Sequence, residues 1–319
     1  MSSPLLEIDR LSVSFRTDEG QLVRVVDDVS LAVYPGETVG LVGESGCGKS
    51  VTAMSVMQLN ASPPAQVDRG HIRFEGKDLL TFSRSAMRRV RGDRIGMIFQ
   101  EPMTSLNPTF TVGRQIAEVL RMHRDVRAAE ARDQTIELLG LVGIGAPARR
   151  YAQYPHELSG GLRQRAMIAM ALACRPALLI ADEPTTALDV TIQAQILNLL
   201  ARLKAELGMS ILLITHDLGV VAQVCQRVVV MYAGRVAEEA DVTSLFARPR
   251  HPYTAALLAS SPRLGLKATT LPTIAGMVPD PSKRGKGCHF ADRCVRALDR
   301  CRSETPPLAE GFACWNPMP

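Results

Sequence analysis

The octapeptide GESGCGKS at residues 43–50 constrains the fold of this 319-residue chain more than any other segment. It follows the apolar run TVGLV and precedes a predicted helix, so it fits G-x-x-x-x-G-K-[ST] in the strand–loop–helix context that this motif needs. Its glycines let successive backbone N–H groups turn toward phosphate oxygens, and the following helix adds its positive end. Lys49 is expected to reach the β- and γ-phosphates of a nucleotide, and Ser50 to ligate Mg²⁺. The residues that we assign to nucleotide binding here are Gly43, Glu44, Ser45, Gly46, Cys47, Gly48, Lys49, Ser50 and Val51.

Strand and helix signals alternate along most of the chain. Residues 5–42 are predicted to be strands, residues 70–100 contain short strands around a basic helix, and residues 112–150 are mostly helical. A second run consists of helix 160–173, strand 177–182, helix 190–207, strand 210–215, helix 217–224 and strand 227–234. Strands that alternate with helices favour an α/β fold with a parallel sheet and crossover helices.

Two adjacent acids end the apolar segment ALLIADEP at residues 177–184. A buried strand would bring Asp182 to its carboxyl end, beside the phosphate loop, where the carboxylate can hold Mg²⁺. Glu183 can polarise or deprotonate the water that attacks the γ-phosphate. Acids at the end of a single strand are common, and it is their combination with the phosphate loop that indicates nucleotide hydrolysis.

A second anion-binding turn lies in HELSGGLRQR, residues 156–165. Ser159, Gly160 and Gly161 precede a predicted helix, whose N-terminal end attracts phosphate. A chain with two such turns resembles the ATPase subunit of an ATP-binding-cassette (ABC) transporter. The resemblance implies a head-to-tail dimer, in which the S-G-G turn of one subunit caps the ATP held by the phosphate loop of the other. The family's usual signature is L-S-G-G-Q, whereas Leu162 follows the second glycine here.

Further positions match the family's motifs one by one. The resemblance implies that Gln100, after the strand RIGMIF, contacts Mg²⁺ and the attacking water. Asp189 ends the dimer-interface loop TTALD, and His216, after the strand SILLIT, corresponds to the histidine that contacts the γ-phosphate. Phe15 is the candidate for the aromatic ring that stacks on adenine, with a place in the core as the alternative. Since Glu183 and His216 are both present, the subunit's own site is expected to hydrolyse ATP.

Three segments narrow the resemblance to one branch of the family. They are FQEPMTSLNP (99–108), RHPYTAALLASSP (250–262) and the cysteine-bearing segment that follows. Together they resemble the oligopeptide/dipeptide permease ATPase subunits over essentially the whole chain. This branch implies import of di- or oligopeptides, powered at the cytoplasmic face of the bacterial inner membrane. It also implies two membrane permease subunits, an extracytoplasmic peptide-binding protein and a second, related ATPase subunit.

Two other functions remain open at this point. The first alternative keeps the same branch but takes nickel or another small molecule as the solute instead of a peptide. The second alternative lies outside the branch and is a soluble ABC ATPase that acts in DNA repair or translation. The segment EPMTSLNP favours coupling to a membrane protein, and the presence of one cassette disfavours the soluble class.

Four of the seven cysteines lie in the last tenth of the chain, separated in turn by five, six and twelve residues. They are Cys288, Cys294, Cys301 and Cys314. The spacing lacks the C-x-x-C pairs of common zinc ribbons and the C-x₂-C-x₂-C run of ferredoxins. The resemblance implies a four-thiolate [4Fe–4S] cluster, since members of this branch with such a tail carry one. A zinc site, unliganded thiols or an oxidised pair are the alternatives, with His251 and His289 as weaker candidate ligands. We expect a structural role, because a metal can order a proline-rich tail that buries little surface.

Composition limits the remaining classes. The chain is 46% hydrophobic and 22% charged, which is ordinary for a globular protein. It has no apolar run long enough to span a bilayer and no apolar secretion signal, so a cytoplasmic chain is expected. The excess positive charge falls after residue 250, but it is scattered and not interleaved with aromatic residues, so nucleic acid is not expected as a partner.

Two parts of the chain are expected from these patterns. Residues 1–248 should form the nucleotide-binding domain, with a helical subdomain at about 101–172 that docks the permease, and residues 249–319 a C-terminal extension. The expected fold class is α/β, a P-loop ABC cassette with a parallel-sheet core, an antiparallel β subdomain and a helical subdomain. The extension adds a small cysteine-rich segment to this cassette.

Overall fold

The computed structural model describes residues 3–100, 105–186, 188–260 and 273–319. The chain forms two compact units. Unit 1 comprises Met1–Tyr34, Thr38–Leu80 and Ile214–Pro319, and unit 2 comprises Pro35–Glu37 and Thr81–Leu213. The phosphate loop therefore belongs to unit 1, whereas the acid pair and the S-G-G turn belong to unit 2.

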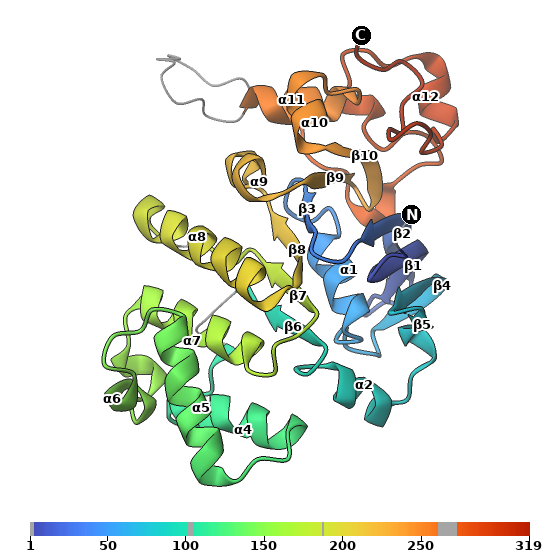
Figure 1. Cartoon of the computed structure of the whole chain (residues 1–319). Coiled ribbons are helices and arrows are strands. Elements are labelled where there is room, and N and C mark those ends of the chain that lie inside the picture. Colours follow the sequence, from blue (N-terminus) through green and yellow to red (C-terminus); the bar gives the residue numbers. More distant parts are fainter. Residues whose placement is uncertain (1–2, 101–104, 187, 261–272) are drawn as a thin grey trace. The chain divides into compact units, whose positions relative to one another are not determined.

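The N-terminal part of unit 1 is a four-stranded antiparallel sheet in the order β2-β1-β4-β5 (Figure 1). Its strands are β1 (Leu6–Arg16), β2 (Leu22–Val33), β4 (Ala65–Phe74) and β5 (Lys77–Asp78). The first strand buries Leu6 and Ile8, and then changes parity and buries Leu11 and Val13. The change occurs at a register shift around Arg10, which has a φ of 49°. Such a bulge keeps apolar side chains on one face although the residue spacing alters.

Three more strands of unit 1 form a mixed arrangement. Strand β9 (Arg227–Tyr232) pairs in parallel with β3 (Thr38–Val42) and antiparallel with β10 (Arg235–Asp241). Every residue of β3 is buried, as expected for a strand covered on both faces. The hairpin between β9 and β10 turns at Ala233 and Gly234, whose φ values of 44° and 86° suit a two-residue connection.

Short helices complete unit 1. They are α1 (Lys49–Val56), α9 (Leu218–Val224), α10 (Val242–Ala247), α11 (Pro252–Ser260) and α12 (Asp299–Ser303). Helix α1 begins directly after the phosphate loop, as the motif predicts. Asp217 is the N-cap residue of α9, and its carboxylate accepts hydrogen bonds from the N–H groups of Gly219 and Val220.

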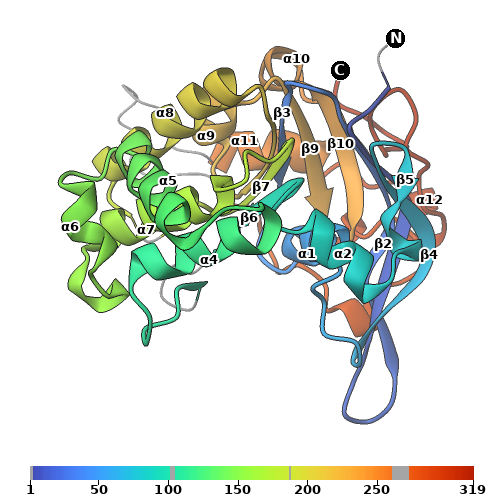
Figure 2. The same cartoon turned by 60° about the horizontal axis from the view of Figure 1, so that its bottom comes forward.

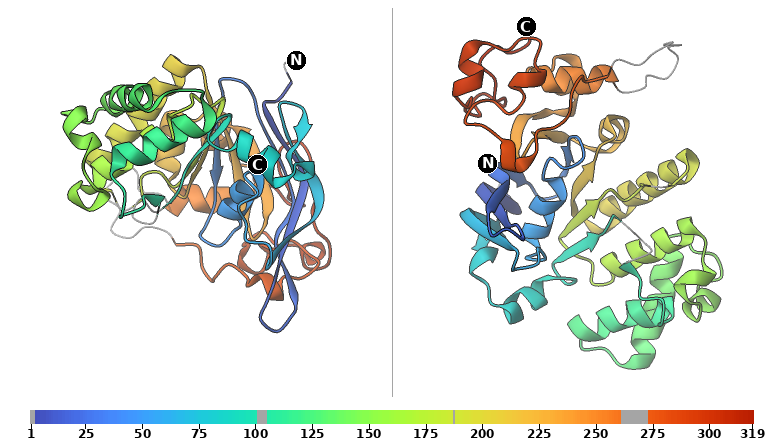
Figure 3. Two further views of the ribbon diagram at one scale, coloured as in Figure 1. Left: turned by 90° about the horizontal axis from the view of Figure 1, so that it is seen from below. Right: turned by 180° about the vertical axis from the view of Figure 1, so that it is seen from behind.

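The C-terminal extension, residues 249–319, packs against β9 and β10 within unit 1, and its later part also packs against its own helix α11 (Figure 3). The rings of Tyr232, Tyr253 and Phe290 form a cluster with centroid separations of 4.6, 5.1 and 5.4 Å. The N–H of Ala313 donates to the carbonyl of Ala237 at 2.9 Å, and so attaches the extension to β10. The extension therefore buries apolar side chains of its own. This corrects the expectation that a proline-rich tail has too little surface to bury.

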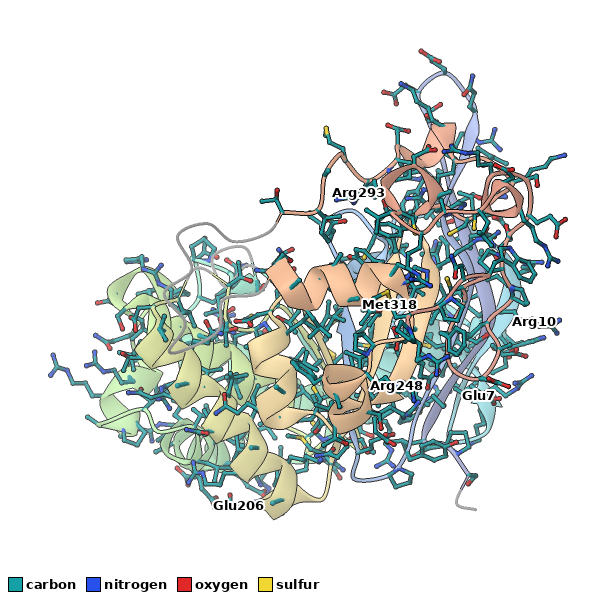
Figure 4. All side chains as sticks on the ribbon, turned by 90° about the horizontal axis from the view of Figure 1, so that it is seen from above. Glu7, Arg10, Glu206, Arg248, Arg293 and Met318 are labelled. Atoms are coloured by element: carbon teal, nitrogen blue, oxygen red, sulfur yellow. The ribbon has the colours of Figure 1, made fainter. Side chains whose placement is uncertain are left out.

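The chain end also lies against this part of unit 1. The N–H of Met318 donates to the carbonyl of Arg250 at 2.8 Å, and the Arg248 guanidinium donates to the carbonyl of Pro319 at 3.0 Å (Figure 4). The segment that follows the last cysteine is thus tied to the start of the extension.

Unit 2 combines a parallel strand pair with a group of helices. Strand β6 (Ile95–Ile98) pairs in parallel with β7 (Leu178–Asp182), and both are fully buried. The helices are α2 (Arg84–Val90), α4 (Val112–His123), α5 (Ala128–Leu141), α6 (Pro147–Tyr151), α7 (Gly160–Leu172) and α8 (Val190–Leu207). Figure 2 shows α4 to α7, in green, gathered together. The remaining strand, β8 (Ser210–Thr215), is divided between the two units, because the division falls after Leu213.

The predicted elements agree closely with these bounds. Helices α7, α8 and α9 and strands β7, β8 and β9 lie where the alternating pattern places them. Strand β10 and helix α11 were not among the predicted elements. Among the described residues, no helix combines the length and the apolar character needed to cross a bilayer.

Candidate nucleotide-binding site

The phosphate loop joins β3 to α1 in a conformation that only glycine can adopt at its first position. Gly43 has a φ of 152°, and a Cβ atom there would lie 2.1 Å from the carbonyl oxygen of Met231. Gly46 and Gly48 have φ values of 76° and 101°, which lets the backbone curl with its N–H groups on one side. Cys47 is fully buried inside the loop, and this burial raises the pKa of its thiol. Cys47 is therefore a packed side chain and not a reactive thiolate.

Lys49 lies folded over the loop that it follows. Its ammonium donates to the carbonyl oxygens of Gly43 at 2.8 Å and Glu44 at 3.1 Å, and the residue is only 6% exposed. A positive charge held at the loop by two neutral carbonyls can exchange them for phosphate oxygens, to which it bonds more strongly. Ser50 lies in the first turn of α1 and is half-buried.

The two acids at the end of β7 differ in their burial and in their backbone conformation. Asp182 is 2% exposed, whereas Glu183 is half-buried and has a φ of 46°, an unusual backbone conformation for a residue other than glycine. One oxygen of Glu183 accepts hydrogen bonds from the amide of Gln100 at 3.0 Å and the hydroxyl of Thr186 at 2.8 Å. The structure thus brings together Gln100 and Glu183, which lie 83 positions apart in the sequence. Strain at a residue with this chemistry is typical of a functional site.

The S-G-G turn lies at the start of α7 in unit 2. Ser159 is the N-cap residue of the helix and is exposed together with Gly160. Leu162, where the family's signature has glutamine, is half-buried. The helix that follows supports the loop after the acids, because the buried amide of Gln164 donates to the carbonyl of Pro184 at 2.5 Å. Sequence reasoning did not assign a role to Gln164 or Thr186, and both are visible only once the fold brings α7 beside this loop.

Three further predicted residues occupy the ends of elements. Asp189 is the N-cap residue of α8, and its carboxylate accepts the N–H of Ile192 at 2.9 Å. His216 is exposed directly after β8. Phe15 is half-buried near the end of β1, paired with Val23 of β2 and with the first residue of β4. Their predicted roles in nucleotide contact and dimerisation stay predictions. Residues 101–104 of the Gln100 segment, residue 187 of the TTALD loop and residues 261–262 of RHPYTAALLASSP lie outside the described residues.

The four C-terminal cysteines share one neighbourhood. Burial, together with the nearby thiols of the other three cysteines, raises the pKa of Cys288 to about 11. Each sulfur accepts a backbone N–H. The donors to Cys301 and Cys314 are Leu298 and Asn316, each at 3.4 Å. The corresponding donors to Cys288 and Cys294 are Phe290 and Arg296. Backbone N–H groups directed at sulfur are the surroundings that stabilise thiolate ligands and tune iron–sulfur clusters.

The same residues do not form a site for a single metal ion. Within the described ranges, no three His, Cys, Asp or Glu side chains lie close enough together to ligate one ion. The two histidines considered as substitute ligands are engaged elsewhere. His251 accepts the N–H of Tyr253 on Nδ1 at 3.0 Å, and Nδ1 of His289 lies 2.8 Å from the carbonyl oxygen of Ala233. The structure thus gives no support to the zinc alternative or to these two histidines as ligands.

Comparison with known proteins agrees with the motifs. The family model for the ABC transporter matches residues 26–186, and that for the oligopeptide/dipeptide transporter C-terminal region matches residues 237–301. A protein of Brucella ovis named as a peptide import ATP-binding protein is 55% identical over 317 residues, which cover 96% of this chain and 94% of the relative. A peptide ABC transporter ATP-binding protein of Sinorhizobium fredii is 54% identical, with 98% and 95% covered.

Solved structures give the same fold. The dimeric ABC transporter cassette MJ0796 is similar with a TM-score of 0.66 and 27% identity, over 74% of this chain and 98% of that one. The cassette cbiO1 of Clostridium perfringens, part of the cbiONQ transporter complex, has a TM-score of 0.65 and 26% identity, over 77% and 92%. The cassette fold expected from the sequence is therefore confirmed. This chain belongs to the ABC transporter family, among the ATPase subunits that carry the oligopeptide/dipeptide transporter C-terminal region.

Proposed function

We propose that this chain is the ATP-hydrolysing subunit that powers import of di- or oligopeptides through a membrane permease. The observation that carries this proposal is the union of two matched regions on one chain, the ABC transporter cassette and the oligopeptide/dipeptide transporter C-terminal region. The relatives that share both regions at 54–55% identity are named for peptide transport.

The predicted motif residues supply the groups that ATP hydrolysis requires. The N–H groups of the phosphate loop and the Lys49 ammonium bind phosphate oxygens. Ser50 and Asp182 offer the oxygen ligands that Mg²⁺ prefers, and Mg²⁺ held by them would supply positive charge against the charge that develops on the phosphates. Glu183 accepts a proton from the attacking water. Gln100 orients the carboxylate of Glu183 through the hydrogen bond described above. His216 donates to the γ-phosphate.

A second ATPase subunit completes each site in the proposal. Ser159, Gly160 and Gly161 of one subunit cap the ATP of the other, and the exposure of Ser159 and Gly160 supports this role. Asp189 lies at the same interface, and Phe15 stacks on adenine. ATP then contacts two protein surfaces only in the closed dimer, so it binds that state more tightly and shifts the population toward it. The partner is a related ATPase chain, as the branch implies.

The remaining partners follow from transport. Two permease subunits dock on the helical region at about 101–172, and an extracytoplasmic binding protein delivers the peptide. The chain is peripheral, at the cytoplasmic face of the inner membrane. In this division residues 1–248 act as the nucleotide-binding domain and residues 249–319 as the extension.

We also propose that the four C-terminal cysteines hold a [4Fe–4S] cluster. Two observations support it: the shared neighbourhood of the thiols, and the backbone N–H that each sulfur accepts. Within the described ranges no three His, Cys, Asp or Glu side chains lie close enough together to hold a metal ion, so the cluster rests on these two observations and on the resemblance of the tail. The cluster would order the loops between the cysteines.

Anaerobic purification tests the cluster. The wild-type chain should be brown and contain about four iron atoms. Cys301→Ser should lower the iron content, whereas Cys174→Ser, which changes a buried cysteine outside the group, should leave it intact. A colourless preparation without iron would refute the cluster and would leave the transport proposal untouched.

Reconstitution of the complex in lipid vesicles tests transport. ATP hydrolysis should depend on the permease and should rise when the peptide-loaded binding protein is added. Labelled peptide should accumulate on the side where the binding protein is absent. Hydrolysis at full rate without permease, together with a failure to co-purify with membrane subunits, would contradict the proposal.

A further inference from the structure

The second residue of the phosphate loop is held by a side chain from the cysteine-rich extension. Arg293 Nη1 donates to Glu44 Oε2 at 2.6 Å, and Nη2 donates to Glu44 Oε1 at 3.0 Å. The two residues are 249 positions apart, and both belong to unit 1 (Figure 4 labels Arg293). The contact is a bidentate ion pair, the geometry in which a guanidinium fixes both the position and the direction of a carboxylate.

The guanidinium of Arg293 is itself completely anchored. Its remaining N–H groups donate to the hydroxyl of Tyr232 at 3.2 Å and to the carbonyls of Ile274 at 3.1 Å and Ala275 at 2.9 Å. All five donors that an arginine offers are thus used. The side chain is 6% exposed, and its bonds with Glu44 raise the pKa of Arg293 above its already high value. A partner this fixed acts as part of the scaffold and not as a mobile surface charge.

The backbone of Glu44 is held from the other side by the same region. Its N–H donates to the hydroxyl of Tyr253 at 2.9 Å, and Tyr253, on α11 of the extension, is fully buried in the aromatic cluster. Its carbonyl accepts the Lys49 ammonium and the N–H of Cys47 at 3.3 Å. Carboxylate, N–H and carbonyl of this one residue are therefore all bonded.

We propose that Arg293 and Tyr253 are positioning residues for ATP, which set the phosphate loop through Glu44. The N–H of Glu44 is directed to Tyr253, so the cradle for phosphate is formed by the N–H groups that follow it. Because Lys49 bonds to the carbonyl of Glu44, a fixed Glu44 also fixes the starting position of the lysine. A loop that is ordered before ATP arrives loses less conformational entropy when ATP binds. The inference rests on ATP binding at this loop.

Nucleotide affinity of single variants tests the positioning role in the full-length chain. Arg293→Met should raise the Kd for ATP by about tenfold, while kcat at saturating ATP stays within about twofold of wild type. Arg293→Lys should also raise it, because an ammonium cannot reproduce the bidentate pair or the five bonds. Tyr253→Phe removes only the hydroxyl and should raise the Kd a few-fold. Arg302→Met is the matched control, because this extension arginine is 64% exposed and pairs with an exposed aspartate.

A double-mutant cycle tests whether Arg293 affects ATP binding through Glu44. If Arg293 acts through Glu44, the double variant of Glu44→Gln and Arg293→Met should bind ATP about as weakly as the weaker single variant. Multiplied effects in the double variant would show that Arg293 acts elsewhere, and would overturn the proposal. So would an unchanged Kd in Arg293→Met, Arg293→Lys and Tyr253→Phe, provided that their melting temperatures without nucleotide match wild type. Failure of the wild-type chain to bind ATP would instead overturn the ATPase assignment.

Discussion

The amide of Gln100 donates a hydrogen bond of 3.0 Å to the carboxylate of Glu183. The hydroxyl of Thr186 donates to the same oxygen at 2.8 Å. Two donors on one oxygen orient the carboxylate and leave its second oxygen as the one directed to other partners. This arrangement lies within unit 2 and supports the proposed role of Glu183 as the group that accepts a proton from water.

Replacement of Glu183 with glutamine should separate binding from hydrolysis. The amide cannot accept the proton, so we expect kcat for ATP hydrolysis to fall by about 10²- to 10⁴-fold while ATP binding persists. ATP should then accumulate in a closed dimer that size-exclusion chromatography detects. Glu206→Gln, an exposed change on α8, serves as the control and should hydrolyse ATP normally. Unchanged hydrolysis in Glu183→Gln would show that the base is another group.

Lys49→Met should remove the main positive charge at the phosphate loop. The substitution keeps the length of the side chain but loses the ammonium that bonds to the loop carbonyls. We expect kcat/KM for ATP to fall at least about 100-fold, with most of the loss in binding. Lys77→Met, at an exposed position of β5, is the matched control. Titration with a fluorescent ATP analogue measures the affinity of both variants. Equal affinities of Lys49→Met and Lys77→Met would contradict the assignment of the phosphate loop.

The aromatic cluster should account for much of the stability of the extension. Phe290 is 3% exposed and contacts the rings of Tyr232 and Tyr253. Phe290→Ala should lower the free energy of unfolding by about 3–5 kcal/mol, since it leaves a cavity among packed rings. Phe246→Ala, which changes a phenylalanine that is 37% exposed, should lower it by only about 1 kcal/mol. Urea denaturation distinguishes these values, and equal losses would show that the cluster is not a packed core.

Stability should depend on pH through His251. This residue is 3% exposed, and its burial lowers its pKa from 6.5 to about 4. The unfolded chain therefore takes up a proton between pH 6.5 and 4 that the folded chain does not. The stability that depends on this difference in pKa is fully present above pH 6.5 and is lost as the pH falls toward 4. The total loss in the free energy of unfolding is about 3 kcal/mol.

His251→Asn removes this titration and keeps an acceptor for the N–H of Tyr253. The difference in unfolding free energy between pH 7 and pH 4.5 should therefore be smaller in the variant than in wild type, by about 2 kcal/mol. His156→Asn, at an exposed histidine, should retain the wild-type dependence. Parallel pH profiles for wild type and His251→Asn would refute the assignment.

Local patterns predicted the parts of the structure that depend on neighbouring residues. The phosphate loop needs only glycines at fixed offsets, a strand before it and a helix after it, and all three are local. Helix α7 and strand β7 carry the same kind of signal in their apolar spacing. The hairpin to β10 had a weaker one, because only Gly234 marks the turn and the strand itself holds two glutamates.

The contacts that hold the site in place could not be predicted in the same way. The bulge at Arg10 reverses the alternation of β1, so a strict period of two places half of its buried apolar residues, Leu11 and Val13, on the wrong face. Arg293 looks like one of many scattered basic residues until the fold brings it to Glu44. Neither residue has a neighbour in the sequence that reveals the other, because the pairing depends on how β9, α11 and the extension pack together.

The distance along the chain between Glu44 and Arg293 also orders events during synthesis. A ribosome releases the phosphate loop early, but the arginine and Tyr253 that hold it emerge only when most of the remaining chain has been made. Nascent cassettes consequently have a glycine-rich loop without its supports for most of their translation. If Arg293 and Tyr253 position the loop as proposed, full affinity for ATP is acquired only after both have emerged, and a chain that terminates before them should retain the nucleotide more weakly than the full chain.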